Sequence, residues 1–93
     1  MHIDKAKKRI AKQVKKGFKG YPQITLAYFG KSPEVACEVV ISFTAEAGAE
    51  VQEQRFVSTV DAREDEVIHS ALVKIIERAD AGSVIAVPGV APL

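Results

Sequence analysis

The side chains best suited to a chemical role are the cations of the first 31 residues. If residues 4–16 form a helix, most of these cations fall within an arc of about 120° on one side of it. That face consists of Lys5, Lys8, Arg9, Lys12, Lys15 and Lys16, and the next segments add Lys19 and Lys31. Clustered cations bind phosphates, so we predict that these side chains form a binding surface for nucleic acid or another polyanion.

The rest of the helix supports a role beyond solubility. Its opposite side is apolar, with Ile3, Ala6, Ile10 and Val14, and Lys7 alone lies among them. Like charges one turn apart cost a helix a few tenths of a kcal/mol per pair. Three such pairs occur, Lys5 with Arg9, Lys8 with Lys12 and Lys12 with Lys16. Any surface helix needs polar residues on its outer side. A helix whose polar side serves only solubility usually carries both positive and negative side chains. The uniformly positive side found here therefore predicts a negatively charged partner.

That partner can lie within the chain itself. Residues 1–31 hold nine Lys or Arg against one Asp, a net charge of +8. Residues 32–93 hold four basic side chains against eleven acidic ones, a net charge of −7, so the whole chain carries only +1. The two halves can therefore attract each other, either within one molecule or between two copies.

Other chemistries find little support. His69 follows Asp65 and Glu66 at helical spacing, but no second His stands one turn away, so we predict no metal site and place His69 at the surface. Cys37 is the only cysteine, which excludes an internal disulfide, and its apolar surroundings predict a buried thiol rather than a nucleophile. No glycine-rich phosphate loop occurs. We therefore predict no catalytic residues, no cofactor and no enzyme.

Known nucleic-acid modules match only in fragments. Residues 17–20 have the Gly-x-x-Gly form of a KH loop, and residues 16–18 resemble the start of the RRM signature. A KH loop joins two helices, whereas a strand pattern follows here, and the further aromatics of an RRM are missing. The element order also resembles that of a double-stranded-RNA-binding domain, but residues 61–66 would bring acids to the start of the second helix. None of these motifs identifies a ligand.

Periodicity predicts the elements that must position the lysines. Asp4 is suited to cap the first helix, and Gly17 and Gly20 to end it. Alternation of apolar and polar residues predicts strands over 23–29, 36–44 and 51–58, the last as a charged edge strand. Asp61 and Glu64 have the spacing of a capping box before a second helix with an apolar stripe. A short strand over 83–87 follows.

These elements predict a single α+β domain over residues 1–93, in the order α-β-β-β-α-β. Its two helices should pack on a mainly antiparallel sheet of three or four strands, with residues 87–93 as a flexible tail. The predicted core comprises Ile10, Val14, Leu26, Val39, Ile41, Phe43, Ile68, Leu72 and Ile75. No apolar run reaches the roughly 18 residues of a membrane span, and no secretory signal follows the first lysines. A lone thiol then favours the cytoplasm.

Two functions remain open from the sequence. The first is a non-enzymatic binding module whose basic helix docks on nucleic acid or another polyanion. The alternative is a protein-interaction or self-associating protein, such as a homodimer, in which the basic and acidic parts pair and an edge strand can contribute. An anionic membrane surface is a weaker candidate, because the apolar face is thin and lacks Trp. An enzyme is the weakest.

Overall fold

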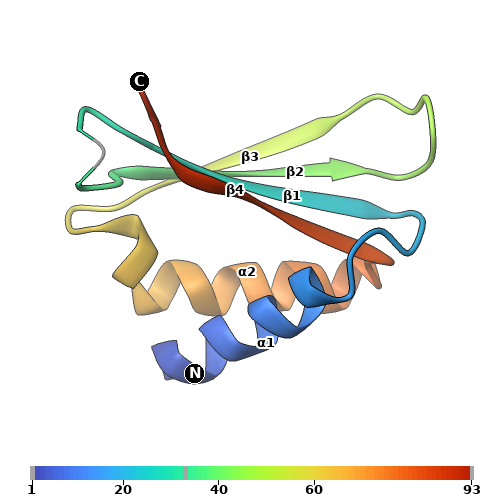
Figure 1. Ribbon diagram of the computed structural model, residues 1–93, viewed down its shortest axis with the longest axis horizontal. Helices are drawn as coiled ribbons and strands as arrows, with labels where there is room; N and C mark the ends of the chain where they lie inside the picture. Colours follow the sequence, from blue (N-terminus) through green and yellow to red (C-terminus); the bar gives the residue numbers. More distant parts are fainter. Residues whose placement is uncertain (1, 33, 93) are drawn as a thin grey trace.

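A computed structural model describes residues 2–32 and 34–92 of the protein. Two helices cover one face of a four-stranded sheet, and the other face carries no helix (Figure 1). The elements in order are α1 (Ile3–Lys15), β1 (Gln23–Gly30), β2 (Glu38–Thr44), β3 (Gln52–Val57), the 3-10 turn η1 (Ala62–Glu64), α2 (Glu66–Ala79) and β4 (Ser83–Pro92). The predicted α+β class and element order are thus confirmed.

The strands lie in the order β3-β2-β1-β4. The pairs β1–β2 and β2–β3 are antiparallel, with Leu26 opposite Ile41 and Ile41 opposite Gln54. β4 pairs with β1 in parallel, with Leu26 opposite Ala86. β3 lies at one edge, as its charged sequence predicts, and β4 lies at the other.

The predicted tail over residues 87–93 is wrong for most of its length. β4 continues to Pro92, which lies opposite Gly30 of β1, while Leu93 lies outside the described residues. The register shifts between Leu26 and Tyr28 of β1, and Gly89 of β4 takes up a φ of 75° that favours glycine. This irregularity lets Val90 return to the ladder opposite Tyr28. The prolines misled the prediction, because an edge strand tolerates them.

The N-cap of α1 lies two residues before the predicted one. His2 occupies the N-cap, and its Nδ1 accepts a hydrogen bond of 3.3 Å from the backbone N–H of Asp4. Asp4 instead lies in the first turn, where its negative charge suits the helix dipole. The helix ends at Lys15, and Gly17 follows with a φ of 70°, as predicted for the terminating glycine.

The sequence predicts one capping box at Asp61 and Glu64, but the structure has two separate N-caps in this region. The Asp61 carboxylate caps η1 by accepting from the N–H of Arg63, and α2 begins only after Asp65. Asp65 accepts hydrogen bonds from the Ser58 hydroxyl at 2.8 Å and from the N–H of Ile68 at 3.1 Å. These two bonds hold the pKa of Asp65 below its ordinary value.

We expect Asp65→Ala to lower the free energy of unfolding by about 1–2 kcal/mol at neutral pH, because α2 loses its cap and Ser58 its acceptor. The folded-state pKa of Asp65 is depressed, so the stabilisation is present above its ordinary pKa of 3.8 and is lost as the pH falls below it. Urea unfolding at neutral and acidic pH should show the variant and the wild type converging. Asp65→Asn, which keeps an acceptor, is the control, and a pH-independent difference would contradict this role.

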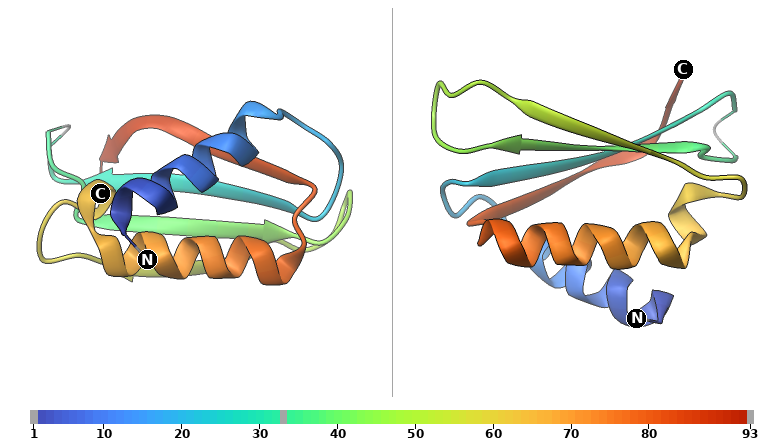
Figure 2. Two further views of the ribbon diagram at one scale, coloured as in Figure 1. Left: turned by 90° about the horizontal axis from the view of Figure 1, so that it is seen from below. Right: turned by 180° about the vertical axis from the view of Figure 1, so that it is seen from behind.

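The core lies between the sheet and the helices. Among the predicted core residues, Ile10, Leu26, Val39, Ile41, Ile68 and Leu72 are buried, and Val14, Phe43 and Ile75 are half-buried against them. Cys37, predicted to be buried, is only half-buried, because β2 begins at Glu38 and Ala36 takes the buried position. Seen from the helix side, α1 and α2 lie beside each other in front of the sheet, and α1 crosses the part that contains β4 (Figure 2).

Candidate polyanion-binding surface

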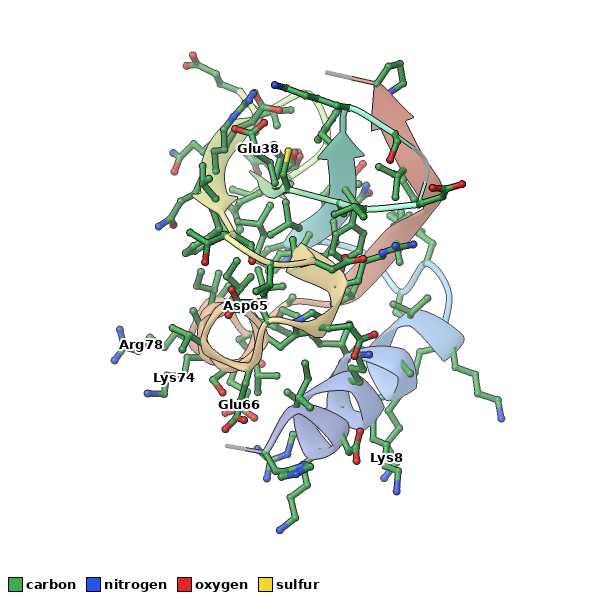
Figure 3. All side chains as sticks on the ribbon, turned by 90° about the vertical axis from the view of Figure 1, so that its left-hand side faces the viewer. Lys8, Glu38, Asp65, Glu66, Lys74 and Arg78 are labelled. Carbon is green, nitrogen blue, oxygen red and sulfur yellow. The ribbon has the colours of Figure 1, made fainter. Side chains whose placement is uncertain are left out.

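The fold fixes which side of α1 faces solvent. α1 contacts α2 and β4, and it buries Ala6 and Ile10 in doing so. The opposite side is exposed, and Lys8 points away from the sheet (Figure 3). We call the exposed set the lysine face, and it consists of Lys5, Lys8, Lys12, Lys15 and Lys16.

Two other cations of α1 pair with the acidic part of the chain. The Arg9 guanidinium lies 3.1 Å from the Glu77 carboxylate of α2, and the Lys7 ammonium lies 2.6 Å from the Glu64 carboxylate of η1. Both pairs are largely exposed, so each contributes at most about 1 kcal/mol. Arg9, which the sequence places on the binding face, is therefore partly neutralised within the chain.

The lysine face itself has no such partner. Among the described residues, no carboxylate lies within 4.0 Å of any of its five ammonium groups. The side chains of Lys8, Arg9, Lys12 and Lys15 surround a shallow hollow of about 450 Å³, which the small Ala11 leaves open. The like-charged pairs predict a negatively charged partner. Within the described residues, the only cations of α1 that pair with carboxylates are Lys7 and Arg9, on the two sides of the lysine face.

Lys19 and Lys31 lie apart from this face. Lys19 follows α1 in the connection to β1, where its backbone N–H donates to the Ser83 hydroxyl at 2.7 Å. Lys31 directly follows β1, in the connection to β2. Lys74 and Arg78, which the sequence does not single out, project from α2 on the flank away from α1 (Figure 3). The structure thus brings together six of the eight predicted binding residues, the five of the lysine face and Arg9 beside them.

His69 is a functional candidate that the sequence places wrongly. It is 3% exposed rather than a surface residue. Its Nδ1 lies 2.9 Å from the carbonyl oxygen of Asp65, and its Nε2 lies 3.3 Å from the Tyr28 hydroxyl. Because a carbonyl only accepts, Nδ1 carries the proton and Nε2 accepts from Tyr28. Its helical spacing from Leu72 and Ile76 is the signal that could have revealed this burial.

Tyr28 and His69 border an open cleft of about 580 Å³ between α1, η1 and the β1–β4 part of the sheet. We call it the α1–β1 cleft. Burial raises the pKa of Tyr28, although the nearby charge of Arg63 opposes this. Charged side chains from two elements also line the cleft, namely Lys7, Lys15, Arg63 and Glu64. The apolar part of the lining comes from Ile10, Ala11, Val14 and Ala86.

Arg63 is held rigidly at this cleft. Its guanidinium donates to both carboxylate oxygens of Asp61, at 3.0 and 2.7 Å, and to the backbone carbonyl of Glu34 at 2.6 Å. The same pairing lowers the pKa of Asp61 to about 2. Asp61 therefore stays ionised at any physiological pH, and Arg63 stays in place beside Tyr28.

No family model, curated protein or solved structure was found to match this chain. Within residues 2–32 and 34–92, no group of three or more His, Cys, Asp or Glu side chains is arranged to hold a metal ion. None of the helices described is both long and apolar enough to cross a membrane.

Proposed function

We propose that the protein is a non-enzymatic binding module whose lysine face docks on the phosphate backbone of a nucleic acid. The observation that carries this proposal is the set of five exposed lysines with no carboxylate within 4.0 Å among the described residues. Such a surface binds through release of counterions from the phosphates and carries no sequence preference of its own. The free Cys37 thiol suits the reducing cytoplasm.

The packing of α1 favours nucleic acid over a membrane surface. An interfacial helix buries its apolar side between lipid headgroups. In this protein Ala6 and Ile10 on that side are already buried against α2 and β4. The exposed side offers ammonium groups and the small Ala11, so it can approach phosphates but has little apolar surface to insert.

We expect binding to duplex DNA and RNA of random sequence, with an affinity that falls steeply with salt. If all five lysines contact phosphates, the slope of log K against log salt should be roughly −4 to −5 for duplex DNA. Fluorescence anisotropy between about 50 and 200 mM salt measures this slope. Absence of binding at the lowest salt concentration would refute the proposal. An affinity that does not change with salt concentration would contradict the role of the lysines.

Self-association through opposite charges is the second candidate. Glu46 and Glu50 are exposed in the β2–β3 loop, and the described residues offer them no ion pair. The neighbouring edge of β3 is unpaired in this chain. Sedimentation velocity separates the candidates: charge pairing between copies gives a dimer at low salt that dissociates at high salt, whereas docking on nucleic acid needs only the monomer.

A further inference from the structure

The α1–β1 cleft has the features of a small-molecule site, and it meets the lysine face at Lys15. We propose that it binds a small organic acid, meaning one carboxylate carried on an apolar body of the size of a phenyl ring or larger. The volume of about 580 Å³ falls within the usual range for ligand pockets, roughly 300–1,000 Å³. This proposal stands whether or not the lysine face binds nucleic acid.

The charges around the cleft favour an anion. Lys7, Lys15 and Arg63 line it together with the carboxylate of Glu64, and the charge of Arg63 is already paired with Asp61. Lys15 has no carboxylate within 4.0 Å in the described part of the chain, so its ammonium group is available. The Lys7 ammonium is engaged by Glu64 at 2.6 Å, and both side chains are more than one-third exposed. An incoming carboxylate can therefore bind the free ammonium group of Lys15, or replace Glu64 on Lys7.

The body of the ligand would lie deeper, against apolar side chains. Ile10 and Val14 of α1 face Ala86 of β4 across the cleft, and the Tyr28 ring contributes an aromatic surface. The Tyr28 hydroxyl donates its proton to His69 Nε2, so it offers no proton to a carboxylate. This places the acid group near Lys15 or Lys7 and the apolar body near Tyr28.

The pairing of Tyr28 with His69 is a preformed part of this site. His69 is 3% exposed, and both of its ring nitrogens are engaged, by the Asp65 carbonyl and the Tyr28 hydroxyl. These bonds fix the Tyr28 ring before any ligand arrives. Arg63 is likewise fixed by two bonds to the Asp61 carboxylate. A ligand thus meets walls that are already ordered, which lowers the entropic cost of binding.

The test uses three probes that separate charge from apolar surface. Phenylacetate carries both features, acetate only the charge, and benzyl alcohol only the ring. We expect phenylacetate, titrated into the whole chain, to shift the amide NMR signals of the cleft residues. Its affinity should exceed that of either partial probe by roughly tenfold, which corresponds to about 1.4 kcal/mol. Equal binding of phenylacetate and benzyl alcohol would overturn the anionic part of the proposal.

Two variants test the binding, and shifts of the Tyr28 and Ala86 amide signals localise it, because these residues line the cleft and not the hollow of the lysine face. Ala11 is exposed on α1 and borders the cleft, so Ala11→Trp should fill it without disturbing the core and should reduce phenylacetate affinity by roughly tenfold or more. Val67→Trp is the matched control, since Val67 is 79% exposed on α2 and does not line the cleft. Glu64→Gln should tighten binding, because it frees Lys7. The site is refuted if Ala11→Trp binds phenylacetate as the wild type does, or if Glu64→Gln weakens it.

Discussion

The double substitution Lys8→Glu, Lys12→Glu is expected to weaken binding to random duplex DNA by roughly 10- to 100-fold at low salt. Both side chains lie at the centre of the lysine face and border its shallow hollow. Each lost phosphate contact should also make the slope of log K against log salt less steep by about 1, so the slope should change by about 2. Anisotropy titrations at several salt concentrations measure both quantities.

Lys74→Glu, Arg78→Glu is the matched control for this experiment. It changes the net charge by the same amount, but its two side chains lie on the flank of α2 away from α1 (Figure 3). We expect it to retain most of the affinity and nearly the whole salt slope. An equal loss in both variants would mean that only overall charge matters, and the lysine face would then have no special role.

Neither double variant should compromise folding. All four positions are exposed on helices, and the carboxylate that Lys12→Glu introduces would stand four residues before Lys16, a favourable spacing for an ion pair. Circular dichroism and thermal unfolding are the checks. A loss of binding with an unchanged unfolding temperature can then be assigned to the missing cations.

Leu72→Ala is expected to produce the largest loss of stability, about 3 kcal/mol, within the range of roughly 2–5 kcal/mol known for buried leucines. Leu72 is 0% exposed on α2, at the centre of the layer between the helices and the sheet. Truncation removes buried apolar atoms and leaves a cavity that the surrounding strands cannot fully close. Urea unfolding followed by circular dichroism gives the free energy and its denaturant dependence.

Val67→Ala provides the control on the same helix. Val67 is 79% exposed, so its truncation should change the free energy of unfolding by less than about 0.5 kcal/mol. If Leu72→Ala costs less than about 1 kcal/mol, the packing of α2 on the sheet is not as described. The wild-type free energy of unfolding from the same experiment sets how much destabilisation by core substitutions the domain can tolerate.

The fold could be predicted largely because its elements follow clear periods. Period two predicted β1 and β2, and the apolar stripe predicted α2. The end of α1 was marked by Gly17, whose left-handed φ few other residues adopt. The parallel pairing of β4 with β1 could not be predicted, because it depends on the crossover through α2 rather than on any local pattern.

The candidate site could be predicted only in part, because some of its contacts join residues that are distant in the sequence. Helical spacing alone placed Lys8 and Lys12 on one exposed face, and the structure agrees. The pairing of Arg9 with Glu77 joins residues far apart in sequence and appears only when α1 packs on α2. His69 and Tyr28 likewise meet only in the folded chain, so the cleft left no signature in either segment.

The position of α1 has a consequence for how the protein assembles during synthesis. α1 is made before the strands of the sheet, yet the elements it contacts, α2 and β4, are made after the other strands. At about 5–20 residues per second, the helix would wait on the order of 4–15 s for them. During this time Ala6 and Ile10 are exposed to solvent on the nascent chain. Electrostatic repulsion among the lysines opposes aggregation of such chains. The charges of the lysine face would thus also keep unfinished chains from aggregating.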